Sequence, residues 1–533
     1  MSIYISSVKP FYSTLALVAL LSLSACGGSN NSGGINQLIN QPSQPVTWEK
    51  NKFEPEAKFV ARCVSPRSGL FPGTSTAYPD RSGTVLQEKH WLRAWNNNYY
   101  LWYDEVEDQN PALFDNPIDY FQQLKTLATT SSGTNKDQFH FTIPTDEYLQ
   151  QSQSGVSAGY GVTFSFINVD TPPREIVVAY TEPNTPASAN LKRGTRILEV
   201  DGRDLVNTTD RADLAPINAG LFPFGTGETH TFKVQDVGSS TTRTITITSA
   251  VITSQPVQNV KIIDTDTGKV GYFTFNAHIG TAEKQLIDAI SSFKDEDISD
   301  LIIDLRYNGG GAIYIAIELG SMIAGAEAAN GQPVGTIKFN DKHADQNESS
   351  PFLTQTPANT PNPNVALPIL NLSRVFVLTG PGTCSASELV MNGLRGVDVE
   401  VIQIGTTTCG KPYGFNPADN CGTAYFSVNF KTENAKGFSE YADGFSPVDT
   451  TEDAGVLLPG CSVKDDFTHE LGDESEARLA TALFYRDNGA CPVSAGRAKG
   501  ASALSSIDGN TIKPIWLNNM ILHKPTVDKK TLK

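Results

Sequence analysis

The segment LIIDLRYNGGGAIYIAIELGSMI, residues 301–323, decides the class of the main domain. It begins with an apolar run typical of a buried strand, turns at three consecutive glycines and continues as an apolar helix. The same alternation of strand and helix returns downstream, where the apolar runs RVFVLTG (374–380) and VEVIQIG (399–405) flank a helical segment. It also precedes the segment, as KVGYFTFNAH (269–278) and the amphipathic GTAEKQLIDAISSF (280–293). This pattern predicts an α/β core with buried strands covered by helices.

The residues before this core have a different pattern, with short strands separated by glycine turns. GYGVTFSF (159–166) alternates around glycines, and LKRGTRILEVDG (191–202) gives a turn, a strand and a second turn. The order of these strands resembles a PDZ domain, in which backbone N–H groups of a glycine-containing loop bind the C-terminal carboxylate of another chain. The matching loop here consists of Gly159, Tyr160, Gly161 and Val162. Such a loop beside an open strand edge can accept an extended peptide as an added strand, whereas the alternative is a plain hairpin with turn glycines.

The first 26 residues have the features of an export signal. The lone charge of Lys9 precedes the apolar run LALVALLSLSA, which is too short for a comfortable membrane span. The run ends in Leu-Ser-Ala-Cys at Cys26, which resembles a bacterial lipobox, so we expect Cys26 to carry a lipid after cleavage. An ordinary cleaved signal with an incidental cysteine is the alternative.

These patterns divide the chain into six segments and predict a multidomain α+β fold. Trp91, Trp95, Tyr99 and Trp102 recur near helical spacing and predict the core of a small helical domain. The segments are a signal peptide (1–26), a tether (27–80), the helical domain (81–150), the PDZ-like domain (154–255), the α/β core (256–495) and a C-terminal tail (496–533).

The charge and cysteine content limit the possible partners. A net charge of −16 disfavours nucleic acid as a partner. We also expect no metal or cofactor, because no Cys/His spacing typical of a metal site occurs. Six cysteines remain besides Cys26, and an even number in an exported chain predicts disulfides. Cys409 and Cys421 flank a loop rich in glycine and proline, and one hypothesis is that they pair with each other.

The segment TCSASELVMNGLRG, residues 383–396, follows an apolar strand and begins a helix. Ser385 and Glu388 have the spacing of a capping box, in which the serine hydroxyl and the glutamate satisfy N–H groups of the first turn. A serine at this position also lies beside unpaired backbone N–H groups that can stabilise an oxyanion, so Ser385 could be a nucleophile. The two interpretations are compatible, because a capping serine can still attack.

Two further segments could meet this serine. The turn Asn308–Gly311 ends a buried strand, and its glycines permit backbone shapes that direct N–H groups at a ligand. Lys411, in TTTCGKPYGF, follows the strand after the serine's helix, so the chain can return it to the same neighbourhood. A lysine acts as a general base only if burial lowers its pKa toward neutrality, and a surface lysine is the alternative.

The PDZ-like segment, DLRYNGGG, CSASE and GKPYG occur in the order found in the C-terminal processing (tail-specific) peptidases, serine peptidase family S41. The resemblance extends over roughly residues 130 to 450, and the ordered set is more specific than any single motif. It implies a Ser/Lys dyad on a ClpP/crotonase-like core, with Ser385 as nucleophile and Lys411 as base. The implied oxyanion donors are the backbone N–H groups of Ala386 and of a glycine in the turn, Gly310.

Three residues depart from this family pattern or compete with it. Many members carry glutamine four residues after the lysine, where this chain has Phe415, so the group that orients the amine is open. Cys384 precedes the serine and could be a rival nucleophile, although we expect it to be disulfide-bonded. His140 is an alternative base, because other branches of the wider family use histidine.

The sequence therefore predicts a lipid-anchored serine endopeptidase that acts on protein or peptide substrates in the bacterial cell envelope. We expect it to face the periplasm, with the membrane contacted only through the N-terminal lipid. The alternatives are a catalytically inactive peptide-binding scaffold and an esterase or amidase that uses the same dyad.

Overall fold

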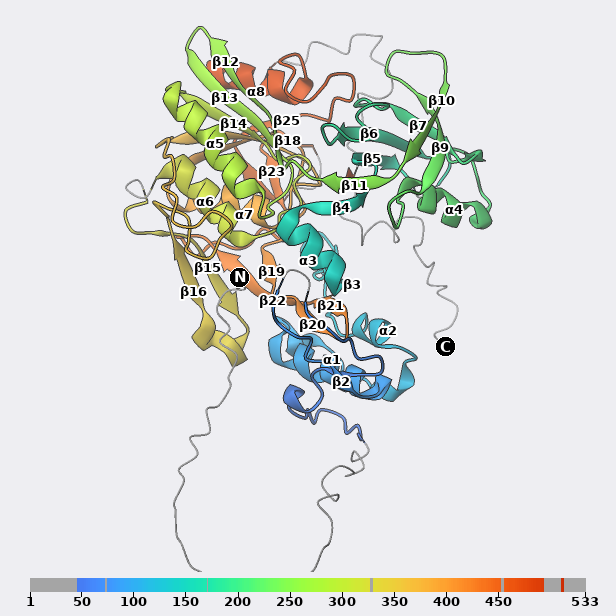
Figure 1. Cartoon of the computed structure of the whole chain (residues 1–533). Coiled ribbons are helices and arrows are strands. Elements are labelled where there is room, and N and C mark those ends of the chain that lie inside the picture. The colour runs from blue at the N-terminus through green and yellow to red at the C-terminus, as the bar shows by residue number, and fades with distance from the viewer. Residues whose placement is uncertain are drawn as a thin grey trace, which may run out of the picture.

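The computed structural model describes residues 46–71, 74–169, 171–325, 329–451, 455–492 and 510–511 (Figure 1). The predicted signal peptide, the lipidation site at Cys26 and all but two residues of the predicted tail lie outside these ranges. Within them, no helix combines the length and the apolar character that a membrane span requires. The fold is a multidomain mixture of helices and sheets.

A six-stranded sheet forms the centre of the core, in the order β12-β13-β14-β17-β18-β25. The strands are β12 (Val257–Thr265), β13 (Gly268–Phe275), β14 (Asp300–Asp304), β17 (Arg374–Thr379), β18 (Glu400–Gly405) and β25 (Gly460–Ser462). β12 is antiparallel to β13, and all other neighbours are parallel. The apolar runs in the sequence thus form the buried parallel strands that their pattern predicted.

Helices cover both faces of this sheet. α5 (Ala282–Asp295), α6 (Ile313–Ala324) and α7 (Ala386–Gly396) pack with Ile303 and Val377. α8 (Ala477–Asn488) packs with Ile302 and Leu378 on the other face. The division follows from strand geometry, since successive side chains of a strand point to opposite faces.

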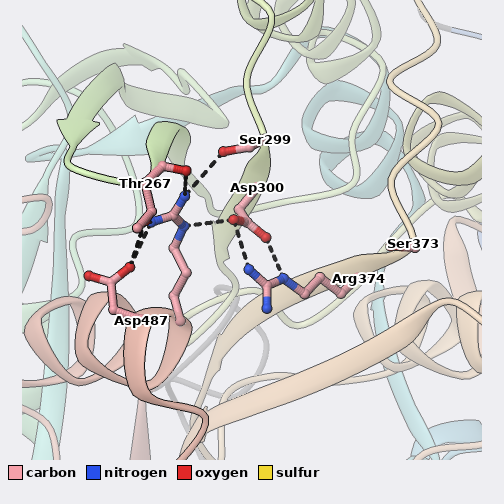
Figure 2. Close-up of a pocket in the computed structure, with 7 residues that line it drawn as sticks. Thr267, Ser299, Asp300, Ser373, Arg374 and Asp487 are labelled. Carbon is pink, nitrogen blue, oxygen red and sulfur yellow. Dashed lines mark hydrogen bonds and ion pairs between the residues drawn. The ribbon is translucent and has the colours of Figure 1, made fainter.

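The central strand β14 is anchored where it begins. Asp300 accepts hydrogen bonds from Nε of Arg374 and from Nε of Arg486, both at 2.6 Å (Figure 2). The three residues line a cavity of about 270 Å³ at this end of the strand. The other end of β14 leads into the Asn308–Gly311 turn, so these ion pairs fix the strand from which the turn emerges.

The β domain, residues 154–255, contains a separate sheet in the order β10-β9-β7-β6-β5-β26. Its strands are β5 (Val162–Asn168), β6 (Glu175–Thr181), β7 (Arg196–Val200), β8 (Arg203–Asp204), β9 (Thr229–Gln235) and β10 (Arg243–Thr248), with helix α4 (Arg211–Leu221) packed on them. β4 (Val156–Gly159) pairs instead with β11 (Ala250–Thr253). The outer edge of β5 is paired antiparallel with β26 (Asn510–Thr511), a segment of the chain's own tail.

The N-terminal region is built on α1 (Val85–Tyr99) and α2 (Pro117–Phe121), which begin at the caps Thr84 and Asn116. Trp91 and Trp95 pack in its core, as their spacing predicted. The predicted tether is not a linker throughout, because Phe59 and Cys63 are buried against this domain. The short elements of the region are η1 (Glu56–Lys58), β1 (Arg62–Cys63), β2 (Arg81–Ser82), η2 (Tyr103–Glu105) and η3 (Pro111–Leu113).

Smaller sheets join this region to the core. β3 (Phe141–Pro144) pairs with β21 (Thr423–Phe426), which pairs with β20 (Ala418–Asn420), and α3 (Thr145–Ser154) leads from β3 to the β domain. A four-stranded sheet has the order β16-β15-β22-β19. Its strands are β15 (Pro333–Phe339), β16 (Glu348–Pro351), β19 (Tyr413–Phe415) and β22 (Val428–Glu433). The remaining elements are η4 (Asp341–Gln346), β23 (Phe445–Pro447) and β24 (Val456–Leu458).

All six cysteines of the described ranges form disulfides, as an exported chain predicts. The pairs are Cys63–Cys421, Cys384–Cys409 and Cys461–Cys491. The hypothesis of a Cys409–Cys421 bond is wrong. Cys421 lies in the tight turn between β20 and β21, which faces the N-terminal region, whereas Cys409 lies beside the start of α7.

Candidate active site

Ser385 lies at the start of α7, in the turn that follows β17. Its backbone has φ 57° and ψ −113°, a left-handed region that residues other than glycine rarely adopt. Such a conformation costs roughly 1–3 kcal/mol and persists only where the surroundings impose it. The N–H of Ala386 is in the first turn of α7 and has no acceptor within the helix. The strained turn therefore places a serine hydroxyl beside the unpaired N–H of Ala386.

One buried carboxylate connects this turn to the loop of Lys411. Oε2 of Glu388 accepts the backbone N–H of Ser385 at 3.0 Å and that of Lys411 at 2.8 Å. Oε1 accepts the N–H of Gly410 at 2.9 Å and the hydroxyl of Thr408 at 2.6 Å. Burial raises the pKa of Glu388, and these hydrogen bonds oppose the rise. Glu388 is the capping residue that the sequence predicted, and it also fixes the second loop.

Lys411 lies in the irregular loop between β18 and β19 and is 9% exposed. Burial lowers its pKa to about 7, although the charges of Asp137 and Glu388 act in the opposite direction. Its Nζ is 3.7 Å from the ring centroid of Phe415 and 5.0 Å from that of Phe139. Phe415 thus contacts the amine with its ring, where the family pattern has an amide. The alternative of a surface lysine is excluded by this burial.

The structure brings Ser385 and Lys411 into one neighbourhood without a hydrogen bond between their side chains. Both backbone N–H groups share one oxygen of Glu388. Cys384, which directly precedes Ser385, and Cys409, two residues before Lys411, are joined by a disulfide with a Cα–Cα distance of 5.2 Å. Hydrogen bonds between catalytic groups are often formed only when substrate is bound. The shared carboxylate and the disulfide therefore fix the backbone of the two residues relative to each other.

The glycine turn packs directly on the serine turn. A side chain at Gly310, whose φ is +93°, would place its Cβ 2.8 Å from the nitrogen of Ala386 and 2.9 Å from the Cβ of Ser385. Glycine is required here by both the conformation and the close approach. The N–H of Gly310 donates to Oδ1 of Asn308 at 2.9 Å, so the expected oxyanion donor is already engaged in this structure.

Asn308 organises this contact, a role that the sequence did not reveal. Its backbone oxygen accepts the N–H of Cys384 at 3.0 Å and the hydroxyl of Ser387 at 2.9 Å. Its Oδ1 also accepts from Nδ1 of His278 at 3.0 Å, which places the proton of that ring on Nδ1. Ser387 is thus a buried structural residue, in agreement with its predicted place in the helix. In the sequence, the position of this asparagine directly before three glycines is the feature that could have indicated the role.

His140 belongs to a buried cluster of the N-terminal region. Its Nε2 lies 2.9 Å from the backbone oxygen of Phe121, and its Nδ1 lies 3.6 Å from Asp137. Burial lowers its pKa. No interaction between His140 and Ser385 is present, whereas Asp137 acts on Lys411. Asp137 is a further site residue that no motif in the sequence indicated.

The loop expected to bind a peptide carboxylate lies where β4 leads into β5. Gly159 ends β4, Gly161 has φ +77°, and Val162 begins β5. Tyr160 is buried, and its hydroxyl donates to the oxygen of Gly220 in α4 at 2.9 Å. The loop is therefore tied to the helix that flanks β5.

Two groups in the described part of the chain bring three possible metal ligands together, and each contains a disulfide. They are Cys384 and Cys409 with Glu388, and Cys461 and Cys491 with Asp449. In both groups the two sulfurs are bonded to each other and hold no free thiolate.

Comparison with known proteins gives a consistent family assignment. Peptidase family S41 matches residues 268–419, and the peptidase S41 N-terminal domain matches residues 87–139. The chain is 25% identical over 370 residues to a carboxyl-terminal-processing protease of Synechocystis sp., covering 66% of this chain and 79% of that protein. It is 25% identical over 264 residues to a carboxyl-terminal-processing protease of Picosynechococcus sp., covering 49% of this chain and 56% of that protein.

A solved structure shows that the fold is shared. A structure from Bacteroides fragilis assigned to the S41 proteases has a TM-score of 0.54 and 23% identity, and the match covers 78% of this chain and 100% of that one. The photosystem II D1 C-terminal processing protease has a TM-score of 0.42 and 16% identity over 70% of this chain and 93% of that one.

The chain spans just over half the length of the Picosynechococcus relative, and the matches make it similar to the peptidases of family S41. More specifically, the chain carries an S41 N-terminal domain followed by an S41 peptidase domain.

Proposed function

We propose that this chain is a serine endopeptidase of the cell envelope that cleaves proteins captured by their C-terminal tails. The observation that carries the proposal is the buried amine of Lys411. Its pKa of about 7 leaves a large fraction uncharged at neutral pH, and its backbone shares the carboxylate of Glu388 with Ser385. An uncharged amine next to a serine in a strained turn is suited to general-base catalysis.

The reaction that we propose passes through an acyl-enzyme. Nζ of Lys411 accepts the proton of the Ser385 hydroxyl as Oγ attacks the scissile carbonyl carbon. The N–H of Ala386 and the N–H of Gly310 stabilise the oxyanion, and the latter must exchange its bond to Asn308 for this role. The protonated amine then gives its proton to the leaving amine. Water, deprotonated by the same amine, hydrolyses the ester and restores Ser385.

We assign substrate capture to the β domain, as a PDZ-like module. The loop from Gly159 to Val162 precedes β5, and β26 pairs with the outer edge of β5, so this edge accepts an added strand. Unstructured protein tails are the class of substrate that fits such an edge.

The direct test is degradation of an unstructured protein such as β-casein, followed by gel and mass spectrometry. Ser385→Ala and Lys411→Ala should each lower kcat/KM by about 10³-fold or more, because single dyad members act as a unit. Lys284→Ala, an exposed lysine on α5, is the matched control and should retain activity. Wild-type protein without cleavage, or Ser385→Ala with full cleavage, would contradict the proposal.

An inactive binding scaffold is the second candidate, and the missing hydrogen bond between Ser385 and Lys411 favours it. A scaffold would bind a tail peptide but would leave β-casein intact and would show no acyl-enzyme by mass spectrometry. An esterase or amidase on the same dyad would turn over p-nitrophenyl esters faster than β-casein. Comparing the two substrates on one preparation separates these candidates.

The location in the envelope is part of the proposal and depends on Cys26. Lipidation at Cys26 would retain the protein in the membrane fraction, and Cys26→Ala should release it into the soluble fraction of cells that export it. Retention of the Cys26→Ala protein in the membrane fraction would exclude a lipid anchor at this residue.

A further inference from the structure

One disulfide lies between the two halves of the proposed dyad. Cys384 directly precedes Ser385, and Cys409 precedes Lys411 by two residues. We propose that Cys384 and Cys409 are positioning residues, whose disulfide holds the loop of Lys411 against the turn of Ser385 so that the enzyme is active only while the bond is intact. This inference rests on the proposed function of the dyad.

The loop that carries the base depends on contacts with the serine turn. Residues 406–412 form neither helix nor strand. The N–H of Cys409 donates to the oxygen of Thr383 at 3.0 Å, and the N–H groups of Gly410 and Lys411 donate to Glu388. The disulfide is the covalent bond in this set of contacts, and it joins the same two segments.

The serine turn needs external support as well. Ser385 has a positive φ that its neighbours must impose. Cys384 is held on one side by its N–H bond to Asn308 and on the other by the disulfide. Reduction would leave the hydrogen bonds as the remaining links between the two segments, and without the covalent bond the segments could move apart as these hydrogen bonds open.

Separation has a defined consequence for the amine of Lys411. Burial next to Phe139 and Phe415 keeps this amine poorly hydrated, and Asp137 and Glu388 are the charged groups that act on it. A loosened loop admits water, which favours the charged amine and removes the base at neutral pH. Loss of the disulfide should therefore affect catalysis more than overall folding.

The chain contains a matched control for this test. The cysteines of Cys461–Cys491 are 30 residues apart in the sequence, and those of Cys384–Cys409 are 25 apart, so the two bonds constrain the unfolded chain to nearly the same extent. Cys461 packs on the α8 face of the sheet, whereas α7 covers the other face. Its removal should affect stability without affecting the dyad.

The experiment compares Cys384→Ser/Cys409→Ser with Cys461→Ser/Cys491→Ser in the full chain. We expect kcat on β-casein to fall by about 10- to 100-fold in the first variant, the effect of a misplaced catalytic group, with KM nearly unchanged. The control variant should stay within about twofold of wild type, a change smaller than such a misplacement causes. Equal activities in the two variants would overturn the inference, whether both are retained or both are lost.

An NMR titration of ¹³C-labelled lysine provides a readout that does not require proteolysis. The Lys411 signal, assigned by its absence in Lys411→Ala, should titrate near pH 7 in wild type and in the control variant. It should move toward the ordinary value of about 10.4 in Cys384→Ser/Cys409→Ser. If the wild-type protein cleaves nothing but the Lys411 pKa still rises in Cys384→Ser/Cys409→Ser, the proposed function is rejected and the positioning role is kept. An unshifted signal would reject the positioning role.

If Cys384→Ser/Cys409→Ser does not fold, reduction of the folded wild-type protein provides the test. Dithiothreitol supplies two electrons and two protons, which convert the disulfide to two thiols and the reagent to its cyclic disulfide. Thiol labelling identifies the opened pair, and near-UV circular dichroism reports whether the fold persists. Activity should fall as Cys384 and Cys409 become labelled and return on reoxidation, whereas full activity with both residues labelled would overturn the inference.

Discussion

The environment of Lys411 determines which protonation state the residue adopts. Burial favours the neutral amine, and the Phe415 ring fills the space next to Nζ without offering an oxygen acceptor. A family-type glutamine there could accept a hydrogen bond from the charged amine, which would favour the charged form. Phe415 is therefore compatible with an active base and is not by itself a sign of inactivity.

The first prediction concerns the pH dependence of activity. With the neutral amine as the base that we propose, kcat/KM should rise with pH through a midpoint of about 7, the pKa of Lys411. Phe415→Ala admits water beside Nζ, so the pKa and the midpoint should shift upward by about one unit or more. Phe415→Leu keeps the site apolar and is the matched control, with a smaller shift. Initial rates from pH 5 to 10 measure this, and identical midpoints in all three proteins would contradict it.

The sequence predicted the positions of Ser385 and Lys411 better than their surroundings. The motifs place a serine at a helix start and a lysine after the next strand, which are local properties. The contact of Lys411 with Phe139, the influence of Asp137 and the bond from Gly310 to Asn308 depend on three-dimensional packing. No spacing within one segment encodes these contacts.

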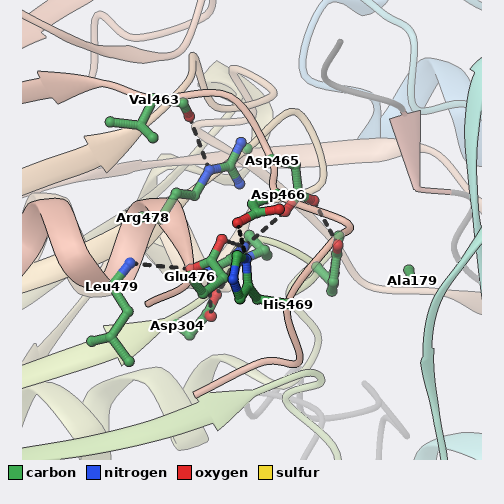
Figure 3. Close-up of polar contacts among 12 residues, drawn as sticks. Ala179, Asp304, Val463, Asp465, Asp466, His469, Glu476, Arg478 and Leu479 are labelled. Carbon is green, nitrogen blue, oxygen red and sulfur yellow. Dashed lines mark hydrogen bonds and ion pairs between the residues drawn. The ribbon is translucent and has the colours of Figure 1, made fainter. Parts of the chain in front are cut away.

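At the scale of elements, a buried ionic network fixes the end of β14 next to the glycine turn. Arg306 donates to Asp304 at 2.9 Å, to Asp465 at 2.7 Å and to Glu476 at 2.7 and 2.9 Å. Figure 3 shows these carboxylates converging from separate segments of the core. The network positions Tyr307, whose hydroxyl donates to Asp465 at 2.5 Å.

The second prediction is that Arg306→Ala strongly destabilises the core. Removal of the cation leaves Asp304 and Glu476 buried without their cationic partner, while Asp465 keeps Arg193, and such a loss costs about 3–5 kcal/mol. Lys284→Ala removes an exposed ion pair with Asp288 and should change the free energy of unfolding by less than about 1 kcal/mol. Urea unfolding followed by fluorescence compares the two, and similar stabilities would show that the network contributes little.

A second buried acidic contact joins α5 to α6. Glu283 and Glu318 are both nearly inaccessible, and Glu283 accepts two hydrogen bonds from Asn362. Burial, together with the charge of Glu283, raises the pKa of Glu318 to about 9. Glu318 is therefore protonated at neutral pH in the folded protein and ionised in the unfolded chain.

The third prediction follows from this difference in proton binding. Between pH 4.5 and about 9 the folded state binds one more proton at Glu318 than the unfolded state, so stability should fall as pH rises. The slope from this group is at most about 1.4 kcal/mol per pH unit. Glu318→Gln cannot ionise and should lose this slope. Measuring the free energy of unfolding at pH 5, 7 and 8.5 tests this prediction. The same dependence on pH in wild type and Glu318→Gln would contradict a protonated Glu318 in the folded state.

The elements differ in how well the sequence predicted them. Continuous apolar runs gave the buried strands β14, β17 and β18, because parallel strands covered on both faces need apolar residues throughout. The ordered part of the predicted tether was missed. Its attachment depends on Cys63, whose partner Cys421 is 358 residues away, and pairing at that distance leaves no local pattern.

At the scale of the whole molecule, the β domain is locked to the core through Arg193. This buried side chain donates to Asp465 at 2.6 Å, to the hydroxyl of Tyr307 at 2.5 Å and to the oxygen of Ala179 at 2.7 Å. The domain proposed to capture substrates thus contacts Tyr307, which directly precedes Asn308 of the glycine turn. The proposed sites of capture and catalysis are therefore joined by a direct polar contact.

The edge of β5 is occupied in this structure by the chain itself. Asn510 pairs with Phe166, and Thr511 pairs with Ser165, in antiparallel register. With this register the tail runs toward the loop of Gly159 as its residue numbers rise. A substrate tail added to the same edge with its carboxylate at that loop would have the same direction. Under the proposed function, the protein's own tail and a substrate would therefore compete for one edge.

The fourth prediction is that removal of residues 493–533 exposes this edge. A labelled peptide with the sequence of residues 505–516 should bind the shortened chain at least about tenfold more tightly than the full chain, because a tethered tail acts at high effective concentration. Both proteins carry Ser385→Ala to prevent cleavage, and fluorescence anisotropy gives Kd. Asn510→Pro/Thr511→Pro in the full chain removes two backbone donors and should bind like the shortened chain, whereas Thr531→Pro should bind like the unchanged full chain. Equal affinities of the full and shortened chains, or no binding to either, would show that β5 does not select its ligand in this way.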